Sequence, residues 1–204
     1  MKSTNKNHWE TVYATKTPDQ VSWTQAVPQT SLDFIASFNM PKSASIIDIG
    51  GGDSNLVDFL LDAGYTNVSV LDISANAIER AKLRLGEKAN AVTWIVSDIT
   101  AFEPTTSYDI WHDRATFHFL TTEQQIKTYQ QIINKAVSGY IALGTFSVDG
   151  PTKCSGLEIK QYSEASLTSI LANGFEKLNC LIEDHITPFA TKQNFIFCSF
   201  KKRI

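Results

Sequence analysis

The segment that most constrains the fold is Ile46–Leu61, which reads IIDIGGGDSNLVDFLL. Its first half is a short apolar run typical of a buried strand, and its second half carries apolar residues at helical spacing. The glycines Gly50, Gly51 and Gly52 separate the two halves. In doubly wound sheets such a turn lies at the carboxyl ends of the strands, where ligands bind. We therefore expect a ligand-binding turn, in which Gly50 and Gly52 are bare so that the backbone can approach the ligand.

Strand-like and helical patterns alternate along most of the chain. The apolar runs that predict strands are Ser45–Ile49, Val68–Asp72, Val92–Val96, Tyr108–His112 and Tyr140–Phe146. Such runs are typical of parallel strands that helices cover on both faces. Two further strand patterns, Phe175–Ile182 and Phe195–Phe200, end the chain with no helical pattern between them. We therefore predict a Rossmann-like, doubly wound α/β sheet of seven strands, mostly parallel, that closes with an antiparallel strand pair.

Length and charge favour one folded domain without a nucleic-acid partner. At 204 residues the chain is long enough for one good-sized core and too short for two comfortable domains, so we predict a single domain over residues 1–204. Lysine and arginine number 18 against 21 aspartates and glutamates, which gives a net charge of −3. A nucleic-acid surface normally needs a clustered basic face. No apolar run approaches the length of a membrane span.

The cysteines and the N-terminus suggest a reducing compartment. Cys154, Cys180 and Cys198 are odd in number and widely spaced, and they contain no CxxC pair. This pattern argues against a disulfide framework and against a zinc site. The first residues also lack the apolar stretch of a secretory signal. We therefore expect a cytoplasmic monomer or homodimer with no metal and no membrane attachment, and we expect Cys154 to lie on a surface loop.

Acidic residues at three successive strand ends indicate which ligand the turn holds. A dinucleotide motif would need glycine at Asn55, and a phosphate-binding loop would need a lysine after the turn, which is missing. Asp48 instead precedes the glycines, where it would repel a phosphate and suit a positively charged amine. Asp72 and Asp98 end the next two strands, where they suit ribose hydroxyls and an adenine amine. Any one of these acids alone could be a cap or turn residue, but together they favour an adenosyl group joined to an amino acid.

These motifs resemble those of the class I S-adenosylmethionine-dependent methyltransferases. The matching segments are Asp48-Ile49-Gly50-Gly51-Gly52-Asp53-Ser54, Leu71-Asp72-Ile73-Ser74 and Ser97-Asp98-Ile99. The resemblance implies S-adenosylmethionine as cofactor, with the first segment beside its methionine part, Asp72 on the ribose, and Asp98 with the Ile99 amide on the adenine. Ile73 would flank the ring, and Ser97 belongs to the third motif. Ser54 replaces the family's last glycine, and we expect Asp53 and Ser54 to open the following helix.

The segment after the fourth predicted strand is the candidate acceptor site. It reads Trp111-His112-Asp113-Arg114-Ala115, and we predict catalytic roles for His112, Asp113 and Arg114. It resembles the W-x-D-R-G segment of thiopurine-type S-methyltransferases and the D-K-G-T segment of lysine methyltransferases that modify elongation factors. Both families have glycine at the position of Ala115. A plain structural alternative is a local Asp113–Arg114 ion pair, with His118 as a loop cap.

Residues 1–28 form a second group of aromatic residues, which we expect to lie over the cofactor as a lid. Trp9, Tyr13 and Trp23 would contact the cofactor, although they could simply dock this segment on the domain. The sequence thus predicts methyl transfer to a small molecule or a protein side chain, with a slight preference for a small molecule. The alternatives are a NAD-binding oxidoreductase and a non-catalytic partner subunit of the same fold.

Overall fold

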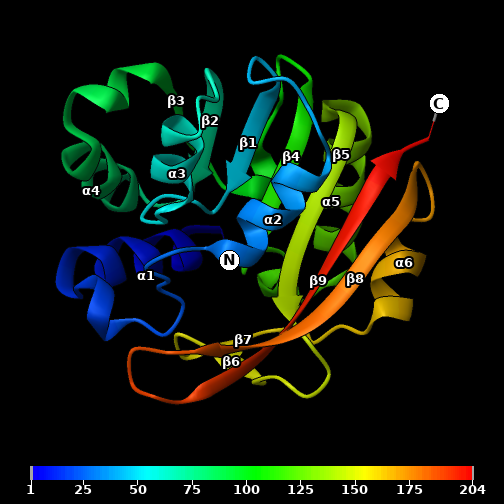
Figure 1. The fold of residues 1–204 in the computed structure, drawn as a ribbon. Helices are drawn as coiled ribbons and strands as arrows, with labels where there is room; N and C mark the ends of the chain where they lie inside the picture. Colours follow the sequence, from blue (N-terminus) through cyan, green and yellow to red (C-terminus); the bar gives the residue numbers. More distant parts are fainter. Residues whose placement is uncertain (1, 204) are drawn as a thin grey trace.

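The computed structural model describes residues 2–203, so Met1 and Ile204, the ends of the predicted domain, lie outside the described residues. A seven-stranded sheet with the order β3-β2-β1-β4-β5-β9-β8 forms the centre of the molecule (Figure 1). The strands are β1 (Ser45–Ile49), β2 (Asn67–Asp72), β3 (Val92–Val96), β4 (Tyr108–Arg114), β5 (Val137–Phe146), β8 (Phe175–Ile186) and β9 (Lys192–Lys202). The first five are parallel and β9 is antiparallel to both its neighbours, which confirms the predicted topology.

Helices cover both faces of the sheet, as the uninterrupted apolar strands predicted. Side chains alternate along each strand, so Ile46 packs on one face with α2 and α3, while Ile47 packs on the other with α5 and α6. The helices are α1 (Lys2–Thr15), α2 (Gln29–Ser37), α3 (Leu56–Asp62), α4 (Ala75–Leu85), α5 (Glu123–Ala136) and α6 (Glu164–Leu171). Short 3₁₀ helices are η1 (Pro18–Gln20), η2 (Gly86–Ala91), η3 (Ile99–Ala101) and η4 (Phe117–Phe119), and β6 (Lys153–Cys154) pairs with β7 (Leu157–Glu158).

The strand order reverses between β1 and β4, and this point opens a space at the carboxyl ends of the strands. In Figure 1, α1 lies directly across the end to which β1 points, and the β6–β7 hairpin lies at the same end of the sheet. The topology therefore brings the N-terminal segment, the glycine turn and the loop after β5 to one edge of the sheet.

The C-terminal strand pair contains a disulfide that the sequence argued against. Cys180 and Cys198 are register partners on β8 and β9 and are joined by a disulfide bond. Their separation of 18 residues gives no hint of this contact, because only the register of the hairpin places the two side chains opposite each other. The structure thus contains one disulfide although the cysteine pattern argued against a disulfide framework, and Cys154 is the free cysteine of the described chain.

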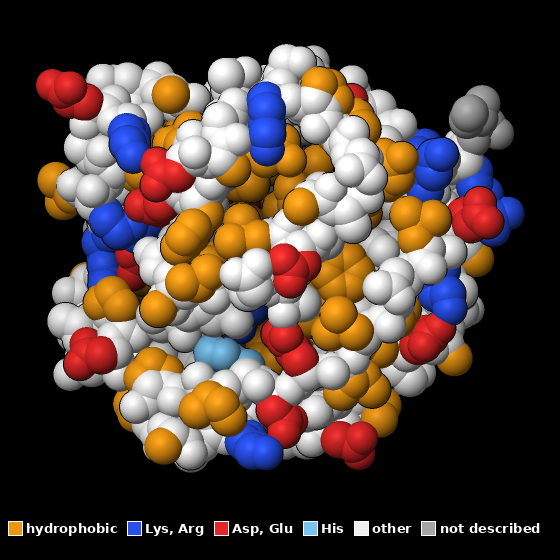
Figure 2. Space-filling view, in the orientation of Figure 1, with side chains coloured by type: hydrophobic (Ala, Val, Ile, Leu, Met, Phe, Trp, Pro, Cys, Tyr) orange, Lys and Arg blue, Asp and Glu red, His pale blue; other side chains and the backbone are white. Residues whose placement is uncertain are grey.

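Charged side chains of both signs are interspersed over the face shown in Figure 2, in keeping with the net charge of −3. Within residues 2–203, no helix combines the length and apolar character that crossing a bilayer requires. The same residues contain no group of three or more potential metal ligands.

Candidate functional site

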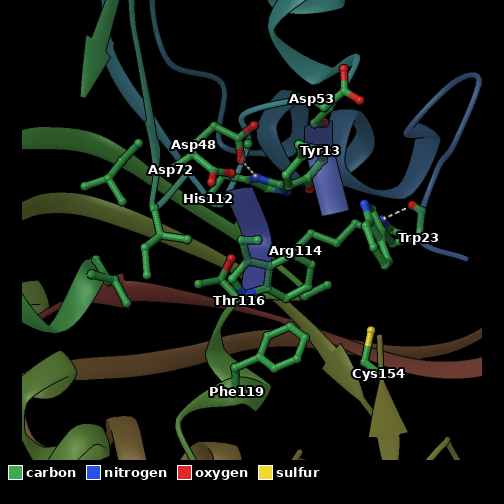
Figure 3. A pocket seen from close by; sticks show the side chains of 18 of the residues that line it. Tyr13, Trp23, Asp48, Asp53, Asp72, His112, Arg114, Thr116, Phe119 and Cys154 are labelled. Carbon is green, nitrogen blue, oxygen red and sulfur yellow. Dashed lines mark hydrogen bonds and ion pairs between the residues drawn. The ribbon is translucent and has the colours of Figure 1, made fainter. Parts of the chain in front are cut away.

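A cavity lies at the carboxyl ends of β1–β4, beneath α1, and collects most of the predicted site residues. Its empty volume is about 1270 Å³, a value that includes the part open to solvent. All predicted site residues line it except Gly52 and Asp113: Trp9, Tyr13, Trp23, Asp48, Gly50, Gly51, Asp72, Ile73, Ser97, Asp98, Ile99, His112 and Arg114. We call the part around Asp48 and Asp72 (Figure 3), together with Asp98, the acidic end. The part around Trp23, Arg114, Phe119 and Cys154 is the arginine end (Figure 3).

Neighbouring side chains leave no room for a Cβ at the three glycines of the turn. Gly50 has a φ of +69°, and a Cβ there would collide with Thr116 Oγ1. A Cβ at Gly51 would collide with Asp48 Oδ2, and one at Gly52 would lie 2.6 Å from the Ala77 Cβ. Gly51 is therefore as constrained as its neighbours, contrary to the expectation that only Gly50 and Gly52 must be bare.

The residues after the glycines also differ from expectation. Asn55, rather than Asp53 or Ser54, is the N-cap residue of α3. Asp53 forms ion pairs with Arg80 (3.1 Å) and Arg84 (3.2 Å) on α4. Ser54 does support the start of the helix, since its Oγ accepts a hydrogen bond from the Leu56 amide at 3.1 Å. Ser54 has no positive φ, so its backbone does not need a glycine.

Asp48 is held by a buried chain of polar side chains. His112 on β4 is its register partner, and His112 Nδ1 lies 2.6 Å from Asp48 Oδ1. The other ring nitrogen of His112 lies 2.8 Å from the hydroxyl of Ser31 on α2, a residue that the sequence did not single out. Asp48 lines the cavity, and its Oδ2 is buried and has no hydrogen-bond partner among the described residues. The site thus contains one buried carboxylate oxygen that is free to accept a ligand's proton donor.

Asp72 is buried and is held by two backbone amides. Its Oδ2 accepts from the Gly52 amide at 3.0 Å, and its Oδ1 accepts from the Ser74 amide at 2.8 Å. Burial raises the pKa of Asp72 to about 6, although these two hydrogen bonds lower it. Each oxygen keeps a second acceptor position, so the carboxylate can still accept two hydroxyl groups from the cavity.

The end of β3 supplies the other polar groups of the acidic end. Asp98 Oδ1 accepts hydrogen bonds from the amide and hydroxyl of Thr100 at 2.8 and 2.7 Å, which caps η3 and fixes the carboxylate. Ser97 donates to the Asp98 carbonyl oxygen at 3.0 Å. Ile99 is buried, and Ile73 beside Asp72 is half-buried and lines the cavity. The three strand-end acids therefore do face one cavity, as their spacing predicted.

Helix α1 is fixed over the cavity by one carboxylate. Glu10 accepts hydrogen bonds from the Ser74 hydroxyl (2.8 Å) and from the amides of Ala75 (2.9 Å) and Asn76 (3.0 Å). These amides belong to the first turn of α4, where backbone N–H groups have no partner within the helix. Together with the helix dipole, they favour a negative charge. Arg80, one helical turn further along α4, donates to the carbonyl oxygen of Lys16 at 2.7 Å. Glu10 lies within the predicted lid segment, but no sequence pattern indicated its contact.

Aromatic rings from the N-terminal segment cover the space between the two ends. The ring centroid of Trp9 lies 5.5 Å from that of Trp23 and 5.2 Å from that of Phe119, both in edge-to-face geometry. Tyr13 lies 6.3 Å from Trp23. His8 bonds the Ser155 hydroxyl at 3.0 Å, which joins α1 to the turn between β6 and β7. The N-terminal segment therefore contacts the chain on both sides of the cavity.

Asp113 faces away from the cavity, into the core beneath α5. Side chains alternate along β4, so His112 and Arg114 share the cavity face, and Asp113 points to the opposite face. Its carboxylate accepts hydrogen bonds from the Tyr129 hydroxyl (2.8 Å) and from the Thr116 and Phe117 amides (3.0 and 3.1 Å). No ion pair joins Asp113 to Arg114 in the described chain. Asp113 instead shapes the turn that carries Thr116 and Phe119 into the site.

Arg114 crosses the arginine end towards Trp23 (Figure 3). Its Nη1 donates to the Trp23 carbonyl oxygen at 2.9 Å, and its guanidinium carbon lies 4.9 Å from the centre of the Phe195 ring. Nε and Nη2 are shielded from solvent and have no partner among the described residues. Desolvation lowers the pKa of Arg114 to about 10, so the group stays protonated near neutral pH.

One other prediction for this region, and one structural alternative, were wrong. Cys154 is buried rather than on an exposed loop, and burial raises the pKa of its thiol to about 12, which makes it a poor nucleophile. His118 does not cap a loop through its ring. It is fully buried, its centroid lies 4.5 Å from that of Phe146, and both ring nitrogens lack partners among the described residues.

The central part of the chain matches known methyltransferases in sequence. Residues 46–137 match the family model described as a methyltransferase domain. The eEF1A lysine and N-terminal methyltransferase of Bos taurus is 30% identical over 88 residues, which is 43% of this chain and 13% of that protein. Malonyl-[acyl-carrier protein] O-methyltransferase 2 of Ilyobacter polytropus is 29% identical over 106 residues, or 52% of this chain and 40% of that protein. The chain therefore spans less than half the length of these curated relatives.

A solved structure shares the fold over the whole chain. The Burkholderia thailandensis 1,6-didemethyltoxoflavin-N1-methyltransferase, with its acceptor and S-adenosylhomocysteine bound, superposes with a TM-score of 0.72. The match covers 100% of this chain and 89% of that one, at 16% sequence identity. It includes the C-terminal antiparallel strand pair as well as the N-terminal segment.

Proposed function

We propose that this chain is a class I S-adenosylmethionine-dependent methyltransferase and that it transfers a methyl group to a small molecule bound at the arginine end of the cavity. The observation that carries this proposal is that Trp9, Trp23 and Phe119 line a compact space beside the acidic end, under the chain's own N-terminal helix. The small acceptor named in the Burkholderia structure supports it. The NAD-dependent alternative is not favoured, since the matching proteins are methyltransferases.

S-adenosylmethionine is the cofactor, and the residues of the acidic end fit it. The unpaired Oδ2 of Asp48 suits the amine of the methionine part, and the acceptor positions of Asp72 suit the ribose hydroxyls. Asp98 and the Ile99 amide suit the adenine, with Ile73 along its ring. When bound, the cofactor supplies a methyl group on a sulfonium sulfur, whose leaving thioether needs no acid.

The predicted catalytic residues divide into different roles under this proposal. His112 has both ring nitrogens in hydrogen bonds, so it positions Asp48 and is not free to act as a base. Asp113 positions the turn after β4. Of these three described residues, only Arg114 offers unpaired donors at the cavity. The chain then contributes to the reaction by aligning the acceptor and excluding water.

We further propose that residues 1–28 act as a lid on a single domain. Trp9, Tyr13 and Trp23 would cover the cofactor, and the bonds of Glu10 to α4 would hold the lid closed. Closing an active site excludes water and strengthens the electrostatic interactions inside it.

Two measurements test the proposed function. Isothermal titration should show binding of S-adenosylhomocysteine and none of NAD, and the reverse result would support the oxidoreductase. Methyl transfer from radiolabelled S-adenosylmethionine into a cell lysate should then label the small-molecule fraction. Label confined to the protein fraction would instead support a protein side chain as acceptor, the class to which the Bos taurus relative's name points.

A further inference from the structure

The arginine end contains a guanidinium whose hydrogen-bonding capacity is only partly used. Arg114 Nη1 donates to the Trp23 carbonyl oxygen, whereas Nε and Nη2 have no partner among residues 2–203. Nε and Nη2 form one edge of the guanidinium, from which arginine binds a carboxylate through two parallel hydrogen bonds. The unpaired donors are therefore arranged as a fork for a carboxylate.

No carboxylate of the described chain forms a direct ion pair with this fork. No carboxylate oxygen lies within the 4.0 Å ion-pair distance of the guanidinium among the described residues. The acids whose charges act on Arg114 are Glu183 and Asp48. Glu183 accepts a hydrogen bond from Thr30, and Asp48 is bound to His112. A buried charge is normally paired, so the chain holds a cation that lacks its counterion.

The other titratable groups around Arg114 are uncharged near neutral pH. Burial and the charge of Arg114 lower the pKa of His118, to about 3, and also lower that of His185. The Cys154 thiol is protonated because burial raises its pKa. Within the described chain, Arg114 thus gives this end a positive charge, and Asp48 and Asp72 lie together on another side of the cavity (Figure 3). The positive charge at the arginine end suits an anionic ligand.

We propose that the methyl acceptor is a small aromatic carboxylic acid, whose carboxylate binds Nε and Nη2 of Arg114 while its ring packs against Trp23 and Phe119. The aromatic part follows from the rings that line this end, which favour edge-to-face or offset packing with a further ring. This inference rests on the proposed function and names its substrate class. It concerns recognition and adds no step to methyl transfer.

The test compares acids with their neutral amides on protein saturated with S-adenosylhomocysteine. Benzoate and indole-3-acetate, with benzamide and indole-3-acetamide, are titrated by calorimetry. We expect each acid to bind at least about tenfold more tightly than its amide, because the amide leaves a buried charge unpaired. Arg114→Gln should weaken binding of the acids by about 30-fold or more, and Arg114→Lys should restore only part of it, since lysine keeps the charge without the fork. Arg203→Gln removes the same charge from the exposed C-terminus and should leave the affinities for the acids unchanged.

Three results would overturn the proposal: neither acid binds at millimolar concentration, the amides bind as tightly as the acids, or Arg114→Gln binds the acids as the native protein does. The first two comparisons use the native protein, so they hold even if an Arg114 variant folds poorly. Failure of S-adenosylhomocysteine to bind would count against the proposed function itself. Its binding without any preference for acids would reject only the substrate class.

Discussion

Asp48 and His112 face each other across β1 and β4, with 2.6 Å between Asp48 Oδ1 and His112 Nδ1. The pairing leaves the second oxygen of Asp48, a residue that lines the cavity, without a hydrogen-bond partner among the described residues. Ser31, on a helix that covers this face, contacts the far nitrogen of His112 at 2.8 Å. The orientation of a carboxylate that lines the cavity thus depends on a residue that the sequence suggested as catalytic.

We predict that His112→Phe weakens S-adenosylhomocysteine binding by about tenfold, because Asp48 loses a buried hydrogen-bond partner. His112→Asn is the matched variant, since its side-chain amide can still donate to Asp48, and it should bind within about threefold of the native protein. Calorimetric titration measures both. Equal affinity of His112→Phe and the native protein would contradict the positioning role.

A second prediction concerns the lid. Glu10→Ala removes three hydrogen bonds from the start of α4, each worth about 1 kcal/mol. We expect faster proteolysis of the N-terminal segment in the absence of cofactor and weaker cofactor binding. Glu79→Ala removes an exposed carboxylate from the same helix and should alter neither property. A Glu10→Ala protein that resists protease as the native chain does would show that other contacts hold the lid.

Ala115 occupies a left-handed conformation with a φ of +70°, where the resembling families have glycine. This conformation costs a residue with a Cβ about 1–2 kcal/mol. Glycine avoids this cost, but it also raises the conformational entropy of the unfolded chain, which offsets part of the gain in stability. We therefore predict that Ala115→Gly raises the free energy of unfolding by up to about 1 kcal/mol. Urea unfolding measures this change. Ala36→Gly, on the exposed side of α2, should instead lower the free energy by about 1 kcal/mol.

The buried carboxyl of Asp113 predicts a pH-dependent stability. Burial raises its pKa from 3.8 to about 6, against hydrogen bonds from Tyr129, Phe117 and Thr116 that lower it. A raised pKa in the folded state means that this group's stabilisation is complete below about pH 4 and is lost as the pH rises through about 6. We therefore expect the free energy of unfolding of the native protein, minus that of Asp113→Asn, to fall as the pH rises over this range. The fall should be roughly 1.4 kcal/mol for each unit by which the folded pKa exceeds the unfolded pKa.

Urea unfolding of both proteins at a series of pH values measures this difference. Asp72 also titrates near pH 6, but it is present in both proteins and cancels in the comparison. A stability difference that stays constant from about pH 4 to pH 7 would contradict the raised pKa of Asp113.

The disulfide between Cys180 and Cys198 gives a fifth prediction. Alkylation of protein purified and unfolded without reductant should modify Cys154 alone. Because the bridge closes a loop of 18 residues, reduction should lower the free energy of unfolding by about 3 kcal/mol. Cys180→Ser should reproduce this loss and remove the effect of reductant, whereas Cys154→Ser should retain that effect. Modification of all three cysteines would show that the bridge does not form.

The strands of the sheet and the acidic end of the cavity could be predicted because their signals are local. Buried parallel strands are continuous apolar runs, and the residues that end them meet at one edge of the sheet. Asp48, Asp72 and Asp98 therefore line one cavity. The orientation of Asp113 could also have been predicted, because side chains alternate along β4 and Asp113 therefore points to the face opposite His112 and Arg114. The sequence interpretation grouped the three residues by adjacency and missed this.

The sequence by itself determined the fold and the acids that line the cavity, because hydrophobic periodicity and strand-end position are properties of short segments. Only the tertiary structure decided which groups are paired and which remain unpaired. Ser31 and His112 fix Asp48, Glu10 binds α4 across 64 residues or more of chain, and Cys180 forms a disulfide with Cys198. The free edge of Arg114 belongs to the same class of facts. A partner, or its absence, depends on how distant segments pack, and local sequence carries no record of that packing.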